Sequence, residues 1–157
     1  MKLFFLITAL FVLNNHSGQE SNQSHYTIDK NGTVRDLKTK LFWQKCTLGQ
    51  ENNSDCSGTP KSFTWEDAIQ ECKNLKLAGK KWSLPSREQL ITIVDYMKTT
   101  GPAIDVKFFP NSPAGGYWSS DTCAQDTSSA WYVNFGMGYI GNDFKLNGSY
   151  VRCVSNR

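Results

Sequence analysis

Helical periodicity is confined to one stretch of this 157-residue chain, and its position limits the folds open to the chain. Apolar residues recur at helical spacing between Thr64 and Met97, whereas the residues after Gly101 show no helical period. They form short alternating or apolar runs separated by prolines and glycines, which is typical of strands and loops. The length suits one domain. We therefore expect a single α+β domain in which two helices pack on short antiparallel sheets joined by long loops.

Two capping boxes mark where the helices begin. Thr64 with Asp67, and Ser86 with Gln89, have the spacing at which a helix-capping side chain and the third helical residue satisfy each other's backbone groups. We expect the first helix to end before Gly79. The apolar faces predicted for the two helices are Trp65, Ala68, Ile69, Cys72 and Leu75 for the first, and Leu90, Ile93, Val94 and Met97 for the second.

Strands are predicted on both sides of the helices. Residues 26–29, an Asn31-Gly32 turn and residues 33–35 indicate a hairpin, which residues 41–45 extend by a third strand. After the helices, the strands expected are residues 117–118, 130–135, 138–144 and 150–154.

Alternation in the second of these later strands separates two faces. Trp131, Val133 and Phe135 are predicted to point inward, and Tyr132 and Asn134 outward. We expect the outward face to be free to bind a ligand.

The N-terminal residues have the pattern of an export signal. Lys2 precedes an apolar run, residues 3–13, that is long enough for a signal peptide and too short to cross a bilayer. A buried strand or core helix is the alternative. We expect residues 1–18 to be a signal peptide, residues 19–25 a polar segment and residues 26–157 the folded domain. The mature protein would be secreted, periplasmic or at the cell surface, with no stable membrane insertion after signal removal.

Five cysteines in an exported chain predict a disulfide framework with one thiol left over. Cys46 and Cys56 flank a polar, turn-rich segment, and their pairing would close a small loop. Among the other three, Cys72 on a helix and Cys153 on the last strand would close a long loop, which leaves Cys123 free. No C-x-x-C is present, so zinc-ribbon and thioredoxin sites are not expected.

Histidine content excludes much catalytic chemistry. The only two histidines, His16 and His25, precede the first predicted strand, so neither a Ser-His-Asp centre nor a His-ligated zinc site is expected. The formal net charge of +3 indicates no nucleic-acid partner. No metal or other cofactor is expected. The carboxylate pairs Glu66 with Glu71 and Asp121 with Asp126 do not stand out from ordinary surface charge.

Five ordered segments carry a family resemblance. They are DKNGTVRDLKTKLFWQK, TWEDAIQECKNLKLAGKKWSLPSREQL, FFPNSPAGGYWSSD, AWYVNFGMGYIGNDFK and YVRCV. In this order they resemble the Lcl C-terminal domain family, a bacterial domain of unknown function named for the end domain of a collagen-like adhesin. The resemblance covers about residues 29–154.

The resemblance implies a C-type-lectin-like fold, related to the scaffold of formylglycine-generating enzymes and of variable receptor-binding proteins. On that scaffold a cysteine of the first helix commonly pairs with one on the last strand, which matches Cys72 and Cys153. A calcium-dependent lectin would carry a Glu ligand that this chain lacks, since only Asn111, Asn142 and Asp143 are available as donors. The chain also lacks an obvious pair of reactive cysteines.

Two surfaces are candidates for binding. The segment from Tyr139 to Tyr150 mixes aromatic and polar residues, which suits either sugar recognition or an ordinary polar hairpin, and its candidate ligand-binding residues are Tyr139, Asn142, Asp143, Lys145, Asn147 and Tyr150. The second surface comprises Lys73, Lys76, Lys80 and Lys81, with Arg87 nearby. It is either a site for a polyanion such as a sulfated polysaccharide or a solvated helix face. The five tryptophans, in contrast, are expected in the core: Trp43, Trp65, Trp82, Trp118 and Trp131.

The sequence thus predicts a non-catalytic, adhesin-like recognition module for a glycan or for a cell-surface or host protein. Two alternatives remain open. One is a cysteine-dependent enzyme on the formylglycine-generating-enzyme-like scaffold, and the other is a structural subunit that forms oligomers.

Overall fold

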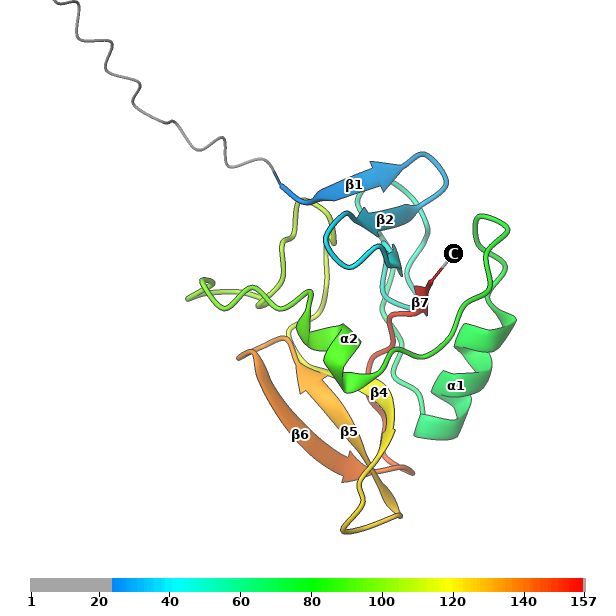
Figure 1. The fold of residues 1–157 in the computed structure, drawn as a ribbon, viewed down its shortest axis with the longest axis vertical. Coiled ribbons are helices and arrows are strands. Elements are labelled where there is room, and N and C mark those ends of the chain that lie inside the picture. The colour runs from blue at the N-terminus through cyan, green and yellow to red at the C-terminus, as the bar shows by residue number, and fades with distance from the viewer. Residues whose placement is uncertain (1–23, 157) are drawn as a thin grey trace, which may run out of the picture.

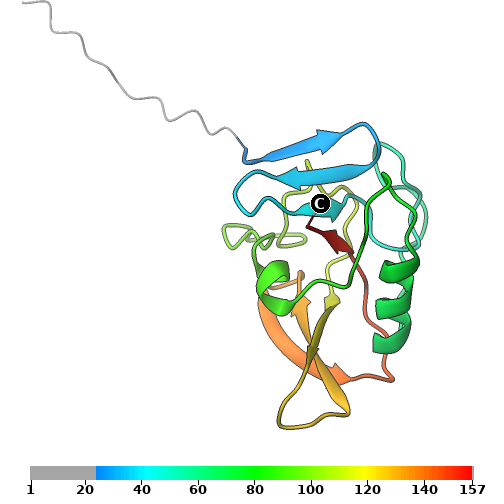
Figure 2. The same ribbon diagram turned by 45° about the vertical axis from the view of Figure 1, so that its right-hand side comes forward.

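The computed structural model describes residues 24–156 and shows an α+β domain (Figure 1). Two antiparallel sheets lie at opposite ends of the domain, and the two helices flank the chain between them (Figure 2). The expected signal peptide lies outside the described residues. Within residues 24–156, no helix is long and apolar enough to cross a membrane.

The N-terminal sheet has the strand order β1-β2-β3-β7. Its hairpin turns at Gly32, whose φ of 83° suits glycine and whose N–H donates to the Asp29 carbonyl at 3.2 Å. The predicted hairpin and third strand are confirmed. The four strands are β1 (Tyr26–Asp29), β2 (Thr33–Asp36), β3 (Phe42–Gln44) and β7 (Val154–Ser155).

The final strand is shorter than the sequence predicted. Only β7 pairs with β3, whereas Tyr150 forms an isolated parallel bridge with Tyr117. The chain from Tyr150 to Val154 therefore runs from one sheet to the other, and this passage links the two ends of the domain.

The second sheet has the strand order β4-β5-β6, with β6 at its edge. Its strands are β4 (Gly116–Thr122), β5 (Ser129–Asn134) and β6 (Tyr139–Phe144). The register pairs Tyr132 with Gly141 and Asn134 with Tyr139. Because alternate residues point to opposite faces, this register decides which β6 side chains share a face with Tyr132.

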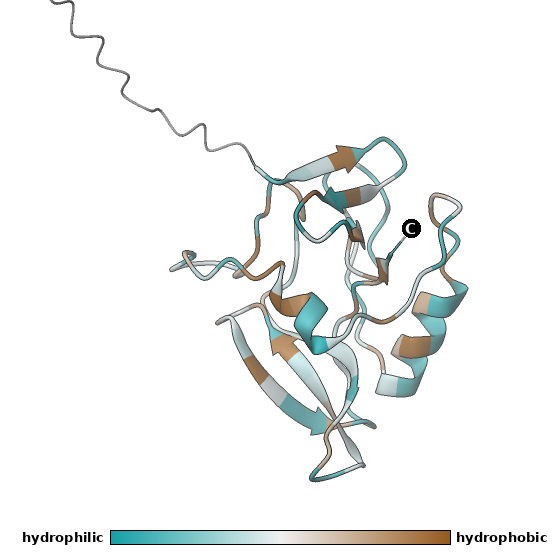
Figure 3. Ribbon diagram, viewed as in Figure 1, coloured by the Kyte–Doolittle hydropathy of each residue, from teal (hydrophilic) through white to brown (hydrophobic). Residues whose placement is uncertain are grey.

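Helix α1 (Trp65–Asn74) begins as predicted, with the Thr64 side chain accepting a hydrogen bond from the Asp67 N–H. Hydrophobic and hydrophilic residues interleave along it (Figure 3), and Ala68 and Cys72 are buried. Both pack in a cluster with Trp118 and Val151, so α1 covers the side of the β4-β5 pair that carries Trp118.

Helix α2 (Arg87–Ile91) has the expected capping box at Ser86, but it is much shorter than the periodicity predicted. After it, the Asp95 N–H donates to the Ala103 carbonyl at 2.9 Å, which takes the backbone out of the helical path. Leu90 and Ile93 are buried as expected, whereas Met97 is 88% exposed. The inclusion of Met97 in a helical core face was therefore wrong.

A second hydrophobic cluster fills the space between the sheets. It joins Val34 and Trp43 of the N-terminal sheet to Leu90 of α2 and to Tyr117 and Val133 of the second sheet. The β4-β5 pair thus has one core cluster on each face, because Trp118 belongs to the cluster under α1. This arrangement makes the two ends of the domain one folding unit.

Both predicted disulfides are present. Cys46 pairs with Cys56, and Cys72 of α1 pairs with Cys153 just before β7, while Cys123 is a buried free thiol. The second bond closes 81 residues of chain and fixes α1 to the segment that joins the two sheets.

Three of the five tryptophans are core residues, as expected: Trp43, Trp82 and Trp118. Trp65 is half-buried and packs against the cluster under α1, whereas Trp131 is half-buried and belongs to neither core cluster, which corrects its assignment to the core. Each lies under a cation, with Lys145 Nζ 4.2 Å from the Trp65 ring centre and Arg87 Cζ 5.0 Å from that of Trp131. Val133 and Phe135 do point inward as predicted.

Candidate functional site

One face of the β4-β5-β6 sheet carries an open group of polar and aromatic side chains. Tyr132 and Asn134 of β5 share this face with Tyr139 and Asp143 of β6, because the register places Asn134 opposite Tyr139 and Ala130 opposite Asp143. We call these four residues the tyrosine face. Tyr132 and Asn134 do lie on the face opposite Val133, as predicted, and this brings them together with two of the late-segment candidates. Both are only half-exposed, however, and Tyr132 packs against the cluster under α1.

Two tyrosine rings form the centre of this face. The rings of Tyr132 and Tyr139 lie 6.2 Å apart at 66°, and their hydroxyl oxygens are 3.4 Å apart. Asn134 Nδ2 donates to the Tyr139 hydroxyl at 3.3 Å. The inner edge of the pair is supported by Trp118, whose ring centre is 6.4 Å from that of Tyr132. The rings therefore run from the core to the sheet edge, where Tyr139 is 42% exposed.

Glycine opposite Tyr132 makes room for its ring. A Cβ atom at Gly141 would lie 2.6 Å from Tyr132 Cζ, and one at Gly116 would lie 3.1 Å from Tyr132 Cδ2. The Tyr132 ring therefore lies across the backbone of both neighbouring strands. A larger residue at position 141 would displace the ring and separate the two hydroxyls.

The hydroxyl contact changes the acidity of the pair. The hydrogen bond with Tyr139, assisted by partial burial and by the charges of Tyr139 and Asp143, raises the pKa of Tyr132 to about 12. Tyr132 therefore stays a neutral phenol at physiological pH. It can both donate and accept a hydrogen bond to a ligand hydroxyl.

Asp143 adds a negative charge to the end of the tyrosine face. Its Oδ1 accepts from the Phe144 N–H at 2.8 Å and from Asn147 Nδ2 at 2.7 Å. These bonds fix the carboxylate and hold Asn147 beside it. Oδ2 has no hydrogen bond within the described residues, so it can accept one from a ligand.

Lys145 is held by neighbouring parts of the fold. Its Nζ lies over the Trp65 ring and donates to Thr122 Oγ1 at 3.0 Å. Its backbone joins α1 to the β4-β5 loop, because its carbonyl accepts from the Trp65 N–H and its N–H donates to the Ser128 carbonyl. Lys145 therefore connects three elements beside the tyrosine face.

Two candidates from the late segment lie away from this face. Asn142 is exposed on the opposite side of β6, where it faces Trp131. Tyr150 is half-buried and packs its ring 5.6 Å from that of Tyr117. Tyr150 is therefore not available to stack on a ligand, because its bridge to β4 turns the ring onto the core.

The donors considered for calcium do not converge. Asn142 and Asp143 are adjacent in β6, so their side chains point to opposite faces of the sheet. Asn111 Nδ2 donates to the Asp55 carbonyl in a separate loop contact. Among residues 24–156 there is no group of three or more His, Cys, Asp or Glu side chains with the geometry to hold a metal ion.

The family model described as the Lcl C-terminal domain matches residues 32–155. The chain belongs to the Lcl C-terminal domain family. No curated protein matches it.

The lysines of this Lcl C-terminal domain are spread along and beyond α1. Lys73, Lys76 and Lys81 are exposed, whereas Lys80 is partly buried, with its Nζ 3.4 Å from the centre of the Phe42 ring. Lys80 and Lys81 also line an open hollow beside the residues that follow β7. Of the four candidate lysines, Lys80 and Lys81 are therefore the two that line this hollow.

Tyr132 and Asn134 are the residues of the tyrosine face that were missing from the candidate ligand-binding set of this Lcl C-terminal domain. The period-two alternation of β5 did indicate that both point outward. Their pairing with Tyr139 depends on the register between β5 and β6. The loop between these strands has no two-residue turn signal, so the sequence does not specify that register.

Proposed function

We propose that this Lcl C-terminal domain is a non-catalytic recognition module that binds a glycan on the tyrosine face. The observation that carries the proposal is the Tyr132–Tyr139 pair, in which Tyr139 is exposed and Tyr132 half-buried, flanked by the amide of Asn134 and the carboxylate of Asp143. Aromatic rings stack on the apolar faces of sugar rings, and amides and carboxylates bind their hydroxyls. A cell-surface or host protein could present such a glycan. We therefore propose an adhesin-like role for the domain.

A C-type-lectin-like fold is part of this proposal. Two features support it: α1 is tied by the Cys72–Cys153 disulfide to the end of the chain, and the helices lie beside short antiparallel sheets. Export to an oxidising compartment is also proposed, because two disulfides of this kind persist where thiols are not kept reduced.

The main alternative is an enzyme that depends on cysteine chemistry. Such an enzyme needs an accessible thiolate, and buried thiols without a cationic neighbour are inert. Cys123, the free thiol of residues 24–156, is buried and its Sγ contacts Gln125 Oε1 at 3.3 Å. This environment favours the binding role over the enzyme.

The experiment is a glycan array probed with the disulfide-bonded protein and three variants. Tyr139→Ala removes the exposed ring, and Tyr139→Phe keeps the ring without its hydroxyl. Phe144→Ala is the matched control, since Phe144 is a 59% exposed ring on the same strand but on the other face. We expect Tyr139→Ala to abolish binding, Tyr139→Phe to weaken it and Phe144→Ala to leave it unchanged. Thermal stability should change by no more than about 0.5 kcal/mol in all three.

Two results would reject the tyrosine face. One is binding to an array glycan that survives Tyr139→Ala, and the other is equal loss in Phe144→Ala. An array with no bound glycan would reject glycan recognition itself. Measuring the molar mass of the same sample tests the remaining alternative, a structural oligomer.

A second candidate ligand is a polyanion such as a sulfated polysaccharide. The observation that favours it is a pair of cations on one aromatic ring: Lys80 Nζ lies 3.4 Å and Arg35 Cζ 5.6 Å from the Phe42 ring centre. Neither cation forms a salt bridge within the described residues. Binding through Lys80 and Lys81 should fall steeply as salt rises, whereas stacking on Tyr139 should largely persist.

A further inference from the structure

A hollow of about 660 Å³ lies between the N-terminal hairpin and the two segments that follow α2. Its walls come from the chain around Tyr26, from residues 92–97 and from the loop around Asp105. The volume is within the range of small-molecule sites. The hollow shares no residue with the tyrosine face.

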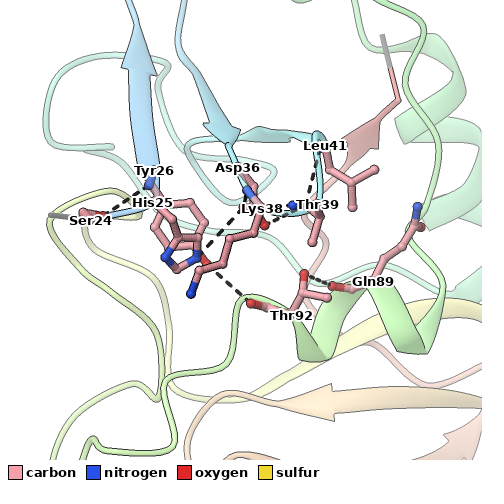
Figure 4. A network of polar contacts seen from close by, with 9 residues as sticks. All are labelled: Ser24, His25, Tyr26, Asp36, Lys38, Thr39, Leu41, Gln89 and Thr92. Atoms are coloured by element: carbon pink, nitrogen blue, oxygen red, sulfur yellow. Dashed lines mark hydrogen bonds and ion pairs between the residues drawn. The ribbon is translucent and has the colours of Figure 1, made fainter. Parts of the chain in front are cut away.

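An aromatic residue with a polar tip lies in the hollow. The Tyr26 ring is buried and packs 5.4 Å from Phe108 and 5.6 Å from Phe109. Its hydroxyl donates to the Thr92 carbonyl at 3.4 Å, as Figure 4 shows. This long hydrogen bond ties the hairpin to the segment after α2 and keeps the phenol at the hollow.

Two carboxylates, those of Asp95 and Asp105, line the hollow. Asp95 Oδ1 accepts from the Met97 N–H and Asp105 Oδ1 accepts from the Lys107 N–H, both at 3.0 Å. These turns fix both carboxylates and leave each Oδ2 without a hydrogen bond among the described residues. Burial raises the pKa of Tyr26, and the fields of Asp36, Asp105 and Asp95 raise it further. The phenol oxygen of Tyr26 therefore lies in the negative potential of these carboxylates.

Two lysines line the same hollow. Lys38 follows β2 and its side chain extends beside His25 in Figure 4, while Lys107 comes from the loop. In the described part of the chain, neither ammonium lies within 4.0 Å of a carboxylate. His25 Nε2 lies 4.0 Å from Asp36 Oδ1 at the edge of the hollow. Charges of both signs thus face one hollow without neutralising each other.

We propose that this hollow binds a small zwitterion of the amino-acid class. Its ammonium group would lie between Asp95 and Asp105, near the Tyr26 hydroxyl, and its carboxylate group would face Lys38 and Lys107. A ligand that carries both charges can pair with carboxylates and ammonium groups at once, whereas a simple cation or anion pairs with one kind of group and meets like charge from the other.

The test uses the disulfide-bonded chain and amide NMR titrations with glycine and γ-aminobutyrate. Methylammonium and acetate serve as the separate halves of these probes. We expect saturable shifts at Thr92 and Lys107 with at least one zwitterion, in the millimolar range or tighter for a ligand of about five to seven non-hydrogen atoms. The separate halves should bind at least about tenfold more weakly.

Three variants decide the assignment. Asp105→Asn keeps the acceptor for the Lys107 N–H but removes the charge, and Lys107→Gln removes one of the two lysine cations of the hollow. Each should weaken binding about tenfold or more, while Lys30→Gln, an exposed lysine outside the hollow, should leave it unchanged. Absence of saturable binding, equal binding of methylammonium or acetate, or unchanged binding in both hollow variants would overturn the proposal.

Discussion

Arg152 is a fully buried cation, and its replacement tests how this fold accommodates a charge. Its Nη1 donates to the carbonyls of Gln44, at 2.8 Å, and of Lys45. Its Nη2 donates to Ser112 Oγ at 2.7 Å and to Thr47 Oγ1 at 3.1 Å. No carboxylate within the described residues forms a salt bridge with it. The positive charge of the guanidinium is therefore stabilised by neutral hydrogen-bond acceptors and not by a counter-ion.

Aromatic faces complete the surroundings of the guanidinium. Arg152 Cζ lies 4.8 Å from the Phe109 ring centre and 5.8 Å from that of Tyr117. Burial lowers the pKa of Arg152, but an arginine remains protonated at any pH at which the protein folds.

The expected cost of Arg152→Met follows from these contacts. Hydrogen bonds to a charged group contribute about 1.5–3 kcal/mol each, so four of them amount to about 6–12 kcal/mol. Methionine avoids the desolvation penalty of the cation, which is several kcal/mol. Taking that penalty as about 3 kcal/mol, we predict a loss of about 3–9 kcal/mol in the free energy of unfolding. Arg152→Lys should lose at least about 2 kcal/mol, because a single ammonium cannot reproduce the planar fork.

Urea unfolding followed by tryptophan fluorescence measures these losses as a shift in midpoint at constant slope. The control is Arg35→Met, which removes an exposed arginine and should change stability by no more than about 0.5 kcal/mol. If Arg152→Met unfolds within about 1 kcal/mol of the parent protein, the four acceptors do not depend on the cation and the reasoning is refuted. Arg152→Lys keeps the test valid if the methionine variant does not fold.

Two further perturbations test the disulfides and the tyrosine pair. Replacing Cys72 and Cys153 with alanine should lower the free energy of unfolding by about 4.5 kcal/mol, because this disulfide closes 81 residues of chain. The same replacement of Cys46 and Cys56 should cost about 2.7 kcal/mol, because that disulfide closes only 10 residues. Equal losses in urea unfolding would contradict the dependence on loop length. The raised pKa of Tyr132 means that the fold favours its neutral form, so its contribution to stability is complete below pH 10 and falls as pH rises through about 12. Between pH 10 and about 12, the free energy of unfolding should therefore fall less in Tyr132→Phe than in the parent protein. If the two proteins lose stability in parallel as the pH rises, the hydroxyl pair does not contribute to the stability of the fold.

Short-range chemistry explains what the sequence could determine by itself. The capping boxes at Thr64 and Ser86, the hairpin turn at Gly32 and the disulfide between Cys46 and Cys56 all join residues close together in the chain. Their energies depend on local geometry, which is encoded within a few residues. The start of each helix and the first hairpin were therefore predictable without knowledge of the rest of the fold.

The length of α2 shows where local pattern stops being sufficient. Ile93 and Met97 continue a helical period, but the backbone of Asp95 pairs with Ala103 instead of an upstream carbonyl. Periodicity records which residues are apolar and does not record which hydrogen-bond partner the backbone will find. The tertiary contact decided that Ile93 is buried and Met97 exposed.

The tertiary structure also decided the composition of the candidate site. Tyr139 and Tyr150 are equivalent as sequence signals, yet Tyr139 meets Tyr132 on an open face, whereas Tyr150 packs on Tyr117. The same holds for Arg152, which as a residue type belongs on the surface and here is buried by hydrogen-bond partners at least 40 positions away. The amino-acid sequence alone indicated which side chains can stack, donate or carry charge. Only the folded chain determines which of them face solvent, because burial is set by contacts between residues that are far apart in sequence.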